Sequence, residues 1–562
     1  MTLCRWILPE PTDPAAVRGL VREAGVARFA AELLLRRGIP AEEAARFLDP
    51  RLKTLGDPFL LPGMEAAVTR IFAALDGGEK IALYGDYDVD GVTSLALLHG
   101  VLQAYGADAP CFLPLRADEG YGLSPDGVAR CVAEHAPRLL IAVDCGTSSV
   151  AEIAELRAQG IDVVVIDHHE CAGALPACAA LVNPKLGTNF HYLCSVGLVF
   201  KTAHALLKRR PLTDFDLRAQ LDLVALGTVA DLVPLRAENR ILVKRGLAQL
   251  ADTRRPGLRA LIEVSALRPP FSPPNIGFGL APRLNAAGRL GTAQDALELV
   301  LTEDPTRART LAAHLDAQNR ERRGVEDDVL RQAEAQLAEW FDPERDAAIV
   351  VGALGWHTGV IGIVASRLQK RFHRPTLVIG FDETGTGKGS GRSIAGLSLV
   401  AALTACGEFL EKHGGHEMAA GLTIREERFA AFRTAFLAYA RAQLTAEQLQ
   451  PRLHLDAELN LGEIDYELLA HHEALQPFGM GHPQPLFFAR GVTLAGEPRV
   501  MKEKHLSLML RQHGDEYRAV WFGAANDELP HLPWDIAFQI ERNEWQGNVS
   551  PQIHLRAVRH CE

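Results

Sequence analysis

Acidic and histidine side chains recur at the ends of apolar segments in the first half of this sequence. There are four such clusters: Asp86-Tyr87-Asp88-Val89-Asp90 after residues 80–83, Asp144 after 139–143, Asp167-His168-His169 after 161–166, and Asp231 after 221–230. Three of the apolar runs have the pattern of buried parallel strands, whereas the run before Asp231 is also compatible with a helix. Groups at the carboxyl ends of parallel strands meet at one edge of a sheet. So many carboxylates and imidazoles at one edge predict a divalent-metal site.

Each cluster also has an ordinary structural explanation when it is considered alone. A single Asp after a strand is most often a helix cap or a turn residue. The pair His168-His169 could be a capping or surface pair. Four independent caps after four apolar runs explain the sequence less well than one shared site. The metal hypothesis therefore rests on the whole constellation and not on any single member.

The predicted site has the ligands that a pair of metal ions needs for phosphoryl transfer. Two divalent cations about 3.5–4 Å apart can hold both the attacking and the leaving oxygen of a phosphate displacement. The predicted ligands are Asp88, Asp90, Asp144, His168 and Asp231. We expect Asp144 to bridge the two ions because its strand should be central, while Asp86 either ligates an ion or orients a ligand. An oxygen-rich site with a histidine favours Mn²⁺ or Mg²⁺ over Zn²⁺.

The composition narrows the class of protein and the compartment. The chain has 562 residues, 48% of them apolar and 23% charged, which is typical of a globular protein with three or four domains. We find no apolar stretch of membrane-spanning length and no signal-peptide pattern, so we expect a cytoplasmic protein without a membrane span. Nine cysteines without a Cys-x-x-Cys motif also indicate a reducing compartment. The net charge of −11 argues against nonspecific coating of nucleic acid but is compatible with a local basic groove.

The apolar periodicity divides the chain into five predicted parts. Residues 1–50 have helical spacing, and residues 51–302 alternate helices with buried strands, as in an α/β fold with a parallel sheet. Residues 303–342 are highly charged with helical periodicity, and we expect one long helix that connects two lobes. Residues 343–450 form a smaller α/β lobe. Residues 451–562 contain short alternating strands typical of a small antiparallel β-barrel.

At this point the motifs resemble a known family. The segments Tyr84–Gly91, Asp167-His168-His169 and Gly227–Asp231 resemble the DHH phosphoesterase superfamily, and Gly414–Gly421 resembles its DHH-associated domain. Two further segments, Arg283–Arg289 and Trp356–Arg367, are similar to the RecJ family of single-strand-specific exonucleases within that superfamily. The terminal barrel would then be the OB fold of this family. The resemblance covers nearly the whole chain from about residue 50.

The resemblance implies a function and a role for each site residue. It implies 5′→3′ exonuclease action on single-stranded DNA in repair and recombination, with release of mononucleotides and two Mn²⁺ or Mg²⁺ ions as cofactors. It assigns the five predicted ligands to the metals, Asp144 and Asp86 to catalysis, and His169 to the scissile phosphate. Some phosphatase relatives have a metal-binding His where this chain has Tyr84. Asp86 or water would then complete the first metal's shell. The metals would activate an attacking water and offset developing charge, so no amino-acid nucleophile is required.

Other side chains are predicted to contact the DNA. They are Arg116, Tyr121, Arg283, Asn285, Arg289, His357, Ser390, Arg392, Ser393, His416 and Trp521. Gly387, Gly389 and Gly391 would let backbone N–H groups approach a phosphate. A flexible surface loop is the favoured explanation of such a segment taken alone, but beside the metal site a role in binding DNA phosphate is favoured. Arg392 can form a planar fork onto a phosphate. Trp521, with Phe522 beside it, could stack on bases as in other OB folds, with a role in the barrel core about equally favoured.

Two other functions are compatible with parts of this pattern. A phosphodiesterase for very short oligonucleotides or cyclic dinucleotides would need the same two-lobe core, but the N-terminal segment and the barrel favour long DNA. A catalytically silent DNA-binding or scaffold protein would have lost metal ligands, whereas all of them are present here. For partners we expect single-stranded DNA and, from the family alone, single-strand-binding protein and a helicase. We expect the protein to be a monomer that does not bind membranes.

Overall fold

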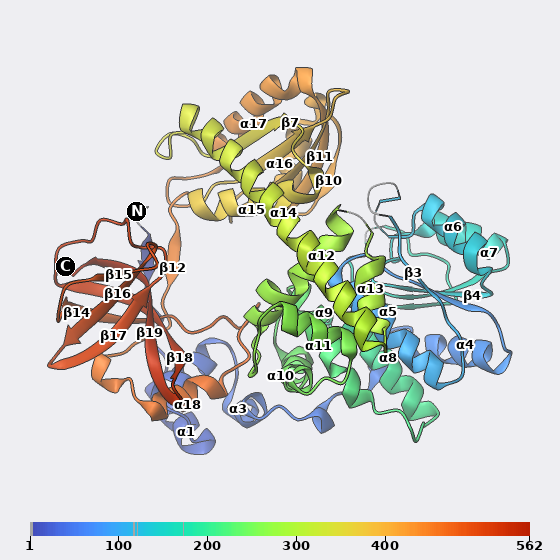
Figure 1. Cartoon of the computed structure of the whole chain (residues 1–562), viewed down its shortest axis with the longest axis horizontal. Coiled ribbons are helices and arrows are strands. Elements are labelled where there is room, and N and C mark those ends of the chain that lie inside the picture. Colours follow the sequence, from blue (N-terminus) through green and yellow to red (C-terminus); the bar gives the residue numbers. More distant parts are fainter. Residues whose placement is uncertain (1–3, 116–118, 121, 172, 291, 562) are drawn as a thin grey trace. The chain divides into compact units, whose positions relative to one another are not determined.

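The computed structural model in Figure 1 describes residues 4–115, 119–120, 122–171, 173–290 and 292–561. These residues form two compact units. The first comprises residues 7–313 and 454–562, and the second comprises residues 4–6 and 314–453. Helix α14 (Pro305–Trp340) begins in the first unit and ends in the second, which confirms the predicted connecting helix.

A five-stranded parallel sheet lies at the centre of the first unit. Its strand order is β3-β2-β4-β5-β6, with β2 at Ile81–Tyr84, β3 at Cys111–Phe112, β4 at Leu139–Val143, β5 at Asp162–Ile166 and β6 at Ala180–Val182. Helices α6 (Pro125–His135) and α7 (Val150–Ala158) pack on one face. Helices α4 (Met64–Asp76), α5 (Val89–Ala104) and α8 (Ser195–Arg209) cover the other face, as Figure 1 shows. With helices on both faces, β2 and β4 are buried along their whole length, which explains their unbroken apolar sequence.

The fourth apolar run is a helix. Residues Leu221–Ala230 form α9, which packs against α5 and α10 (Ala237–Ala251). Every side chain from Leu221 to Val229 is buried, so the helix is apolar on all sides and shows no amphipathic period. The remaining helices of this region are α11 (Pro256–Val264), a π-helical turn at Asn275–Leu280, α12 (Ala281–Leu290) and α13 (Gln294–Leu301).

The C-terminal residues of the first unit form the predicted barrel. Strands β14 (Phe487–Leu494), β18 (Trp534–Trp545), β19 (Asn548–His560), β17 (Asp515–Trp521) and β16 (His505–Gln512) pair in this order, and β14 also pairs with β16, which closes the ring. The short strands β13 (Ala457–Glu458) and β15 (Arg499–Met501) extend it at either end, and α18 spans Tyr466–Ala474. A further short pair joins β1 (Arg5–Ile7) and β12 (Arg452–His454).

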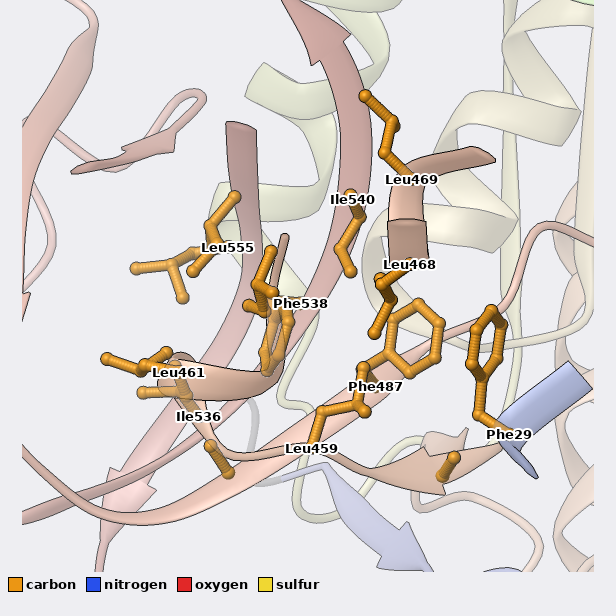
Figure 2. Packing of buried hydrophobic residues seen from close by; sticks show 14 of the residues in the cluster. Phe29, Leu459, Leu461, Leu468, Leu469, Phe487, Ile536, Phe538, Ile540 and Leu555 are labelled. Carbon is orange, nitrogen blue, oxygen red and sulfur yellow. The ribbon is translucent and has the colours of Figure 1, made fainter. Parts of the chain in front are cut away.

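The N-terminal helices share a hydrophobic core with the barrel. These helices are α1 (Pro14–Ala24), α2 (Arg28–Arg36) and α3 (Ala41–Leu48). Figure 2 shows Phe29 of α2 beside Phe487 of the barrel, and their rings meet edge to face with centroids 5.4 Å apart. Phe538 and Ile540 of β18 belong to the same cluster and are also labelled in Figure 2. The N-terminal helices thus help to close the barrel core.

The second unit contains a mixed five-stranded sheet. Its order is β10-β11-β9-β8-β7, with β7 at Ile349–Leu354, β8 at Thr376–Phe381, β9 at Thr386–Arg392, β10 at Leu410–Gly415 and β11 at Ala419–Arg425. Only β7 and β8 are parallel. Helix α15 (Thr358–Phe372) and the end of α14 pack on one face, whereas α16 (Leu399–Ala405) and α17 (Phe429–Gln443) pack on the other.

The helices were compared in length and composition with those that cross a membrane. Within the described ranges, no single helix has the length and apolar composition needed to cross a bilayer, although the bent pair Leu52–Leu60 and Met64–Asp76 has them jointly.

Candidate metal centre and nucleic-acid surfaces

The predicted metal ligands meet at the carboxyl edge of the parallel sheet. Strands β2, β4 and β5 are adjacent and parallel, so the segments that follow them converge. Their ligand atoms form three groups, each with all atoms within 4.8 Å of one another: Asp86, Asp88 and Asp144; Asp90, His168 and Asp231; and Asp144, His168 and His169. The structure therefore brings all the proposed ligands together and adds Asp86 to the set.

Asp144 occupies the centre of this arrangement. It belongs to two of the three groups, and its Oδ1 lies 3.3 Å from Nε2 of His168. It follows the central strand β4 in a left-handed conformation with φ of +63°. A non-glycine residue in this region is strained unless its surroundings hold it there. The backbone N–H of Asp144 donates to Ile166 O, and the hydroxyl of Ser195 donates to Oδ1 at 2.9 Å, so the side chain is held from both ends.

The start of helix α8 holds Asp90. The backbone N–H groups of Ser195 and Val196 donate to the two carboxylate oxygens of Asp90 at 2.7 and 2.9 Å. These N–H groups have no partner within their own helix, and the helix dipole also favours an anion at this end. Ser195 therefore supports Asp90 through its backbone and Asp144 through its side chain. It lies 105 residues after Asp90 in the sequence, and no sequence pattern links the two.

The acidic motif of residues 86–91 caps helix α5 and also supplies potential metal ligands. Oδ1 of Asp88 accepts the N–H groups of Asp90 and Gly91, so Asp88 is the N-cap of α5, as the ordinary interpretation expects. Gly91 is required because a Cβ there would lie 2.3 Å from the carbonyl oxygen of Asp86. This close approach packs the first turn of α5 against the backbone of Asp86.

Asp167 orients His169. Its Oδ1 accepts a hydrogen bond from Nδ1 of His169 at 2.7 Å, and its Oδ2 accepts one from the N–H of Thr147. Burial by itself would raise the pKa of Asp167, but the hydrogen bonds from His169 and Thr147 lower that pKa well below its usual range. Burial opposes protonation of His169, yet the bond to Asp167 raises the pKa of His169 above its ordinary value. Because Nδ1 is engaged with Asp167, Nε2 is the nitrogen that can face a substrate phosphate.

The electrostatics of the cluster call for a cation. Burial, together with the charge of Asp88, raises the pKa of Asp90 to about 7. Burial and the neighbouring carboxylates likewise raise the pKa of Asp144 well above its usual range and that of Asp231 to about 9. Oδ2 of Asp231 is buried and accepts no hydrogen bond from the described part of the chain. These carboxylates repel one another in a desolvated site, and bound cations would remove that repulsion.

His168 completes a donor set that fits Mn²⁺ or Mg²⁺. Burial and the nearby His169 lower the pKa of His168 to about 4, so its imidazole is neutral and can ligate a metal. Its Nε2 lies 3.7 Å from Asp231 and 3.9 Å from Asp90. Carboxylate oxygens with one imidazole suit Mn²⁺ and Mg²⁺, and a carboxylate shared between two groups is the arrangement expected for a metal pair. The residues present therefore fit the implied metals.

Helix α12 places three predicted DNA contacts beside this centre. A Cβ on Gly288 would lie 3.1 Å from the carbonyl oxygen of Tyr87, so α12 packs directly on the acidic loop. Arg283, Asn285 and Arg289 on this helix are all partly exposed. One guanidinium nitrogen of Arg283 donates to the carbonyl of Gly279 at 2.7 Å.

In the second unit, polar groups gather between β9 and α15. His357 is the N-cap of α15, and its Nδ1 accepts the N–H of Gly359. Arg392 donates to the hydroxyl of Ser390 at 3.2 Å, which shows that both side chains lie on the same face of β9. A Cβ on Gly362 of α15 would lie 3.0 Å from that hydroxyl. Ser390 and Arg392 therefore face the first turns of α15, while His416 is exposed beyond the end of β10.

Two expectations for this lobe are wrong. The glycine-rich segment is not a loop with open N–H groups, because β9 pairs with β8 on one side and β11 on the other and its backbone belongs to these ladders. Its glycines are required by packing, since a Cβ on Gly391 would lie 2.6 Å from the side chain of Leu377. Ser393 is buried and its hydroxyl donates to Leu397 O at 2.7 Å, so it does not present a donor to a phosphate.

The barrel corrects a third expectation. Trp521 is only 4% exposed and belongs to the core that the barrel shares with the N-terminal helices, so it cannot stack on a base. Phe522, the next residue, is 51% exposed and lies with its ring centroid 5.1 Å from both His505 and His554. Trp521 is the last residue of β17 and faces the core, whereas Phe522 lies in the turn that follows the strand. Arg116 and Tyr121 lie outside the described residues.

Family models match three segments of the chain, and named relatives match nearly all of it. The family model of the DHH family, N-terminal domain, matches residues 80–228, that of the DHHA1 domain matches 346–442, and that of the RecJ OB domain matches 455–557. The single-stranded-DNA-specific exonuclease RecJ of Bacillus subtilis is 36% identical over 98% of this chain and 70% of its own length. The protein of the same name from Dickeya dadantii is 39% identical, over 90% of this chain and 92% of its own length.

A solved structure agrees with these matches over the whole length of the chain. The crystal structure of RecJ in complex with Mn²⁺ from Thermus thermophilus superposes with a TM-score of 0.85 and 32% identity, covering 100% of this chain and 80% of that one. A second structure of the same protein, in complex with Mg²⁺, gives a TM-score of 0.80. From the shared domains, the identities and the fold, the chain belongs to the RecJ family of the DHH phosphoesterases.

Proposed function

We propose that the protein is a metal-dependent exonuclease that hydrolyses single-stranded DNA from the 5′ end and releases mononucleotides. The observation that carries this proposal is the cluster around Asp144, in which one buried carboxylate is shared by two groups of potential ligands. Two divalent cations held by these residues would supply Lewis-acid stabilisation of the phosphate and an activated water. The relatives named above bear the name of single-stranded-DNA-specific exonucleases.

Different side chains would bind the metals, the scissile phosphate and the DNA backbone. Asp86, Asp88 and Asp144 would hold one cation, Asp90, His168 and Asp231 would hold the other, and Asp144, whose Oδ1 lies 3.3 Å from Nε2 of His168, would be shared by both. His169 is oriented by the hydrogen bond of its Nδ1 to Asp167, so its Nε2 would donate to the scissile phosphate and help to position it. The partly exposed arginines of α12, Arg283 and Arg289, together with Asn285, contact the DNA backbone beside the acidic loop.

The other domains bind the strand. In residues 343–450, Arg392, Ser390, His357 and His416 recognise phosphate. In the barrel of residues 451–562, Phe522 with His505 and His554 offers an exposed aromatic surface for stacking on bases. None of the nine cysteines forms a disulfide in the described structure, in keeping with a reducing cytoplasm. We place the activity in DNA repair and recombination, with the protein acting as a monomer alongside single-strand-binding protein and a helicase.

The test uses the purified full chain, Mn²⁺ and single-stranded DNA labelled separately at each end. Immediate release of labelled mononucleotide from the 5′ end, with stepwise shortening of the 3′-labelled strand, is the expected result. A duplex with blunt ends is the control and should resist digestion. Cleavage restricted to dinucleotides, with long strands left intact, would replace this proposal with a phosphodiesterase for short substrates.

A further inference from the structure

Helix α15 covers part of one face of the sheet in the second unit, and beyond it, across β10 and β11, this face is polar and exposed. The cross-strand register of β10, β11 and β9 aligns Lys412, Thr423 and Lys388 in one row. Side chains alternate along a strand, and the residues flanking Thr423, Leu422 and Ile424, are buried in the core on the opposite face. The row of Lys412, Thr423 and Lys388 therefore points away from the core, and both lysines are exposed.

On β10 and β11, the neighbouring row on this face is a strip of glycines without side chains. Gly414 of β10 lies opposite Gly421 of β11, which in turn lies opposite Ser390 of β9. A Cβ on Gly414 would meet no atom within 4 Å, and a Cβ on Gly421 would meet only Gly389 O, at 3.6 Å. Neither glycine has a positive φ, so neither is required by its backbone conformation. Glycines in a strand that neither crowding nor conformation explains indicate that something approaches the backbone closely.

The charge of this face is positive and not neutralised. In the described chain neither Lys388 nor Lys412 forms an ion pair within 4.0 Å. Glu411 is held by Arg425 at 2.7 Å, so its charge is offset. Lys388 also continues the line of Arg392 and Ser390, because residues two apart on a strand share a face and are about 7 Å apart.

We propose that Lys388 and Lys412 contact phosphates of the single strand and that a sugar or base lies against the strip of Gly414 and Gly421. The inference rests on the proposed function and extends the phosphate contacts from Arg392 and Ser390 across β9, β11 and β10. Two lysines separated by one strand lie about 10 Å apart, so each reaches a different phosphate. Contacts of this kind carry no sequence preference.

The experiment measures binding of fluorescent oligothymidine by the full chain in EDTA, where no turnover occurs, over a range of salt concentrations. Each lysine that neutralises one phosphate contributes about 0.7 to the slope of log K against log salt for a single strand. Lys388→Ala and Lys412→Ala should each reduce the slope by about 0.7, and the double variant by about 1.4. At low salt near 0.05 M, each single variant should bind roughly eightfold more weakly.

Two further variants make the test specific. Lys370→Ala removes an exposed lysine from the last turn of α15 in the same unit and should leave the slope unchanged. Gly421→Val fills the open strip with a residue that strands favour, and it should weaken binding without changing the salt slope. Thermal melting checks that each variant folds.

The outcomes separate the inference from the function beneath it. If the wild-type protein neither binds oligothymidine nor releases nucleotides with Mn²⁺, the proposed function itself fails. If the wild type does both but Lys388→Ala and Lys412→Ala keep the wild-type slope, this inference alone is overturned. Equal slope losses in Lys370→Ala would overturn it as well, since they would indicate a general effect of charge.

Discussion

Replacing Ser195 by Ala should weaken metal binding and leave the fold intact. The hydroxyl of Ser195 is buried and donates to Oδ1 of Asp144 at 2.9 Å. The substitution removes this one bond, because the backbone N–H groups that hold Asp90 remain in an alanine variant. Ser195 is the first residue of α8, where alanine is a good helix former.

The size of the effect follows from the charge of the acceptor. A hydrogen bond to a charged group contributes about 1.5–3 kcal/mol, and about 1.36 kcal/mol corresponds to a tenfold change in affinity. With cations bound, Asp144 is ionised and the bond is at full strength, so Mn²⁺ affinity should fall roughly tenfold to a hundredfold. Without cations, burial and the neighbouring carboxylates raise the pKa of Asp144, so loss of the hydroxyl should alter stability less, by about 1 kcal/mol.

The assay is the exonuclease rate as a function of Mn²⁺ concentration, with calorimetric titration of Mn²⁺ as a second readout. The maximal rate of Ser195→Ala should stay near that of the wild type, because the ligands themselves are unchanged. Ser94→Ala is a matched control: Ser94 is a buried serine of α5 whose hydroxyl has no hydrogen-bond partner in the described structure. Unchanged Mn²⁺ affinity in Ser195→Ala, or an equal loss in Ser94→Ala, would refute the reasoning.

Three further predictions concern catalysis, pH and stability. Asp144→Asn should lower the rate of single-turnover cleavage about a thousandfold, because the loss of a bridging charge costs several kcal/mol of transition-state stabilisation. A normal rate in a variant with normal metal content would contradict the bridging role of Asp144. His482 is buried beside Arg37, and burial lowers its pKa to about 3. The unfolded chain therefore binds the extra proton below about pH 6.5, and stability should fall by about 2 kcal/mol from pH 7 to pH 5. Thermal melting of His482→Gln should show a correspondingly smaller drop. The buried ammonium group of Lys201 lies 2.9 Å from the carboxylate of Glu238. Lys201→Met should therefore lower the free energy of unfolding, measured with denaturant, by about 3–5 kcal/mol, because it leaves the charge of Glu238 buried and unpaired. A loss below about 1 kcal/mol would show that Glu238 finds another partner.

The sequence was sufficient to predict the strands of the parallel sheet and the convergence of the acidic clusters. Runs such as residues 139–143 are continuously apolar because both faces of the sheet are covered, and this pattern is local. The run before Asp231 was ambiguous, because a helix buried on every side has no amphipathic period. The partner of Asp144 could not be found, since Ser195 meets it only through the tertiary fold.

The errors in the second half of the chain have a common physical origin. Periodicity identifies a strand but does not say which of two adjacent aromatics, Trp521 or Phe522, faces the core. Likewise, a run of glycines such as that in residues 385–391 can occur both in an open loop and in a strand that packs closely. Only the neighbours decide, and here the side chains of Phe381 and Leu422 occupy the space above Gly387 and Gly389.

The left-handed backbone of Asp144 has a consequence for how this family can change over time. With φ of +63°, the position accepts Asp, Asn or Gly readily, whereas Ala is disfavoured by about 1–2 kcal/mol and β-branched residues by more. The backbone conformation therefore limits which residues this position tolerates, even when metal binding is no longer required. A lineage that gave up nuclease activity but kept the fold should drift to Asn or Gly here before any other residue. Asn or Gly at the end of β4 would therefore identify relatives that keep the fold but have lost nuclease activity.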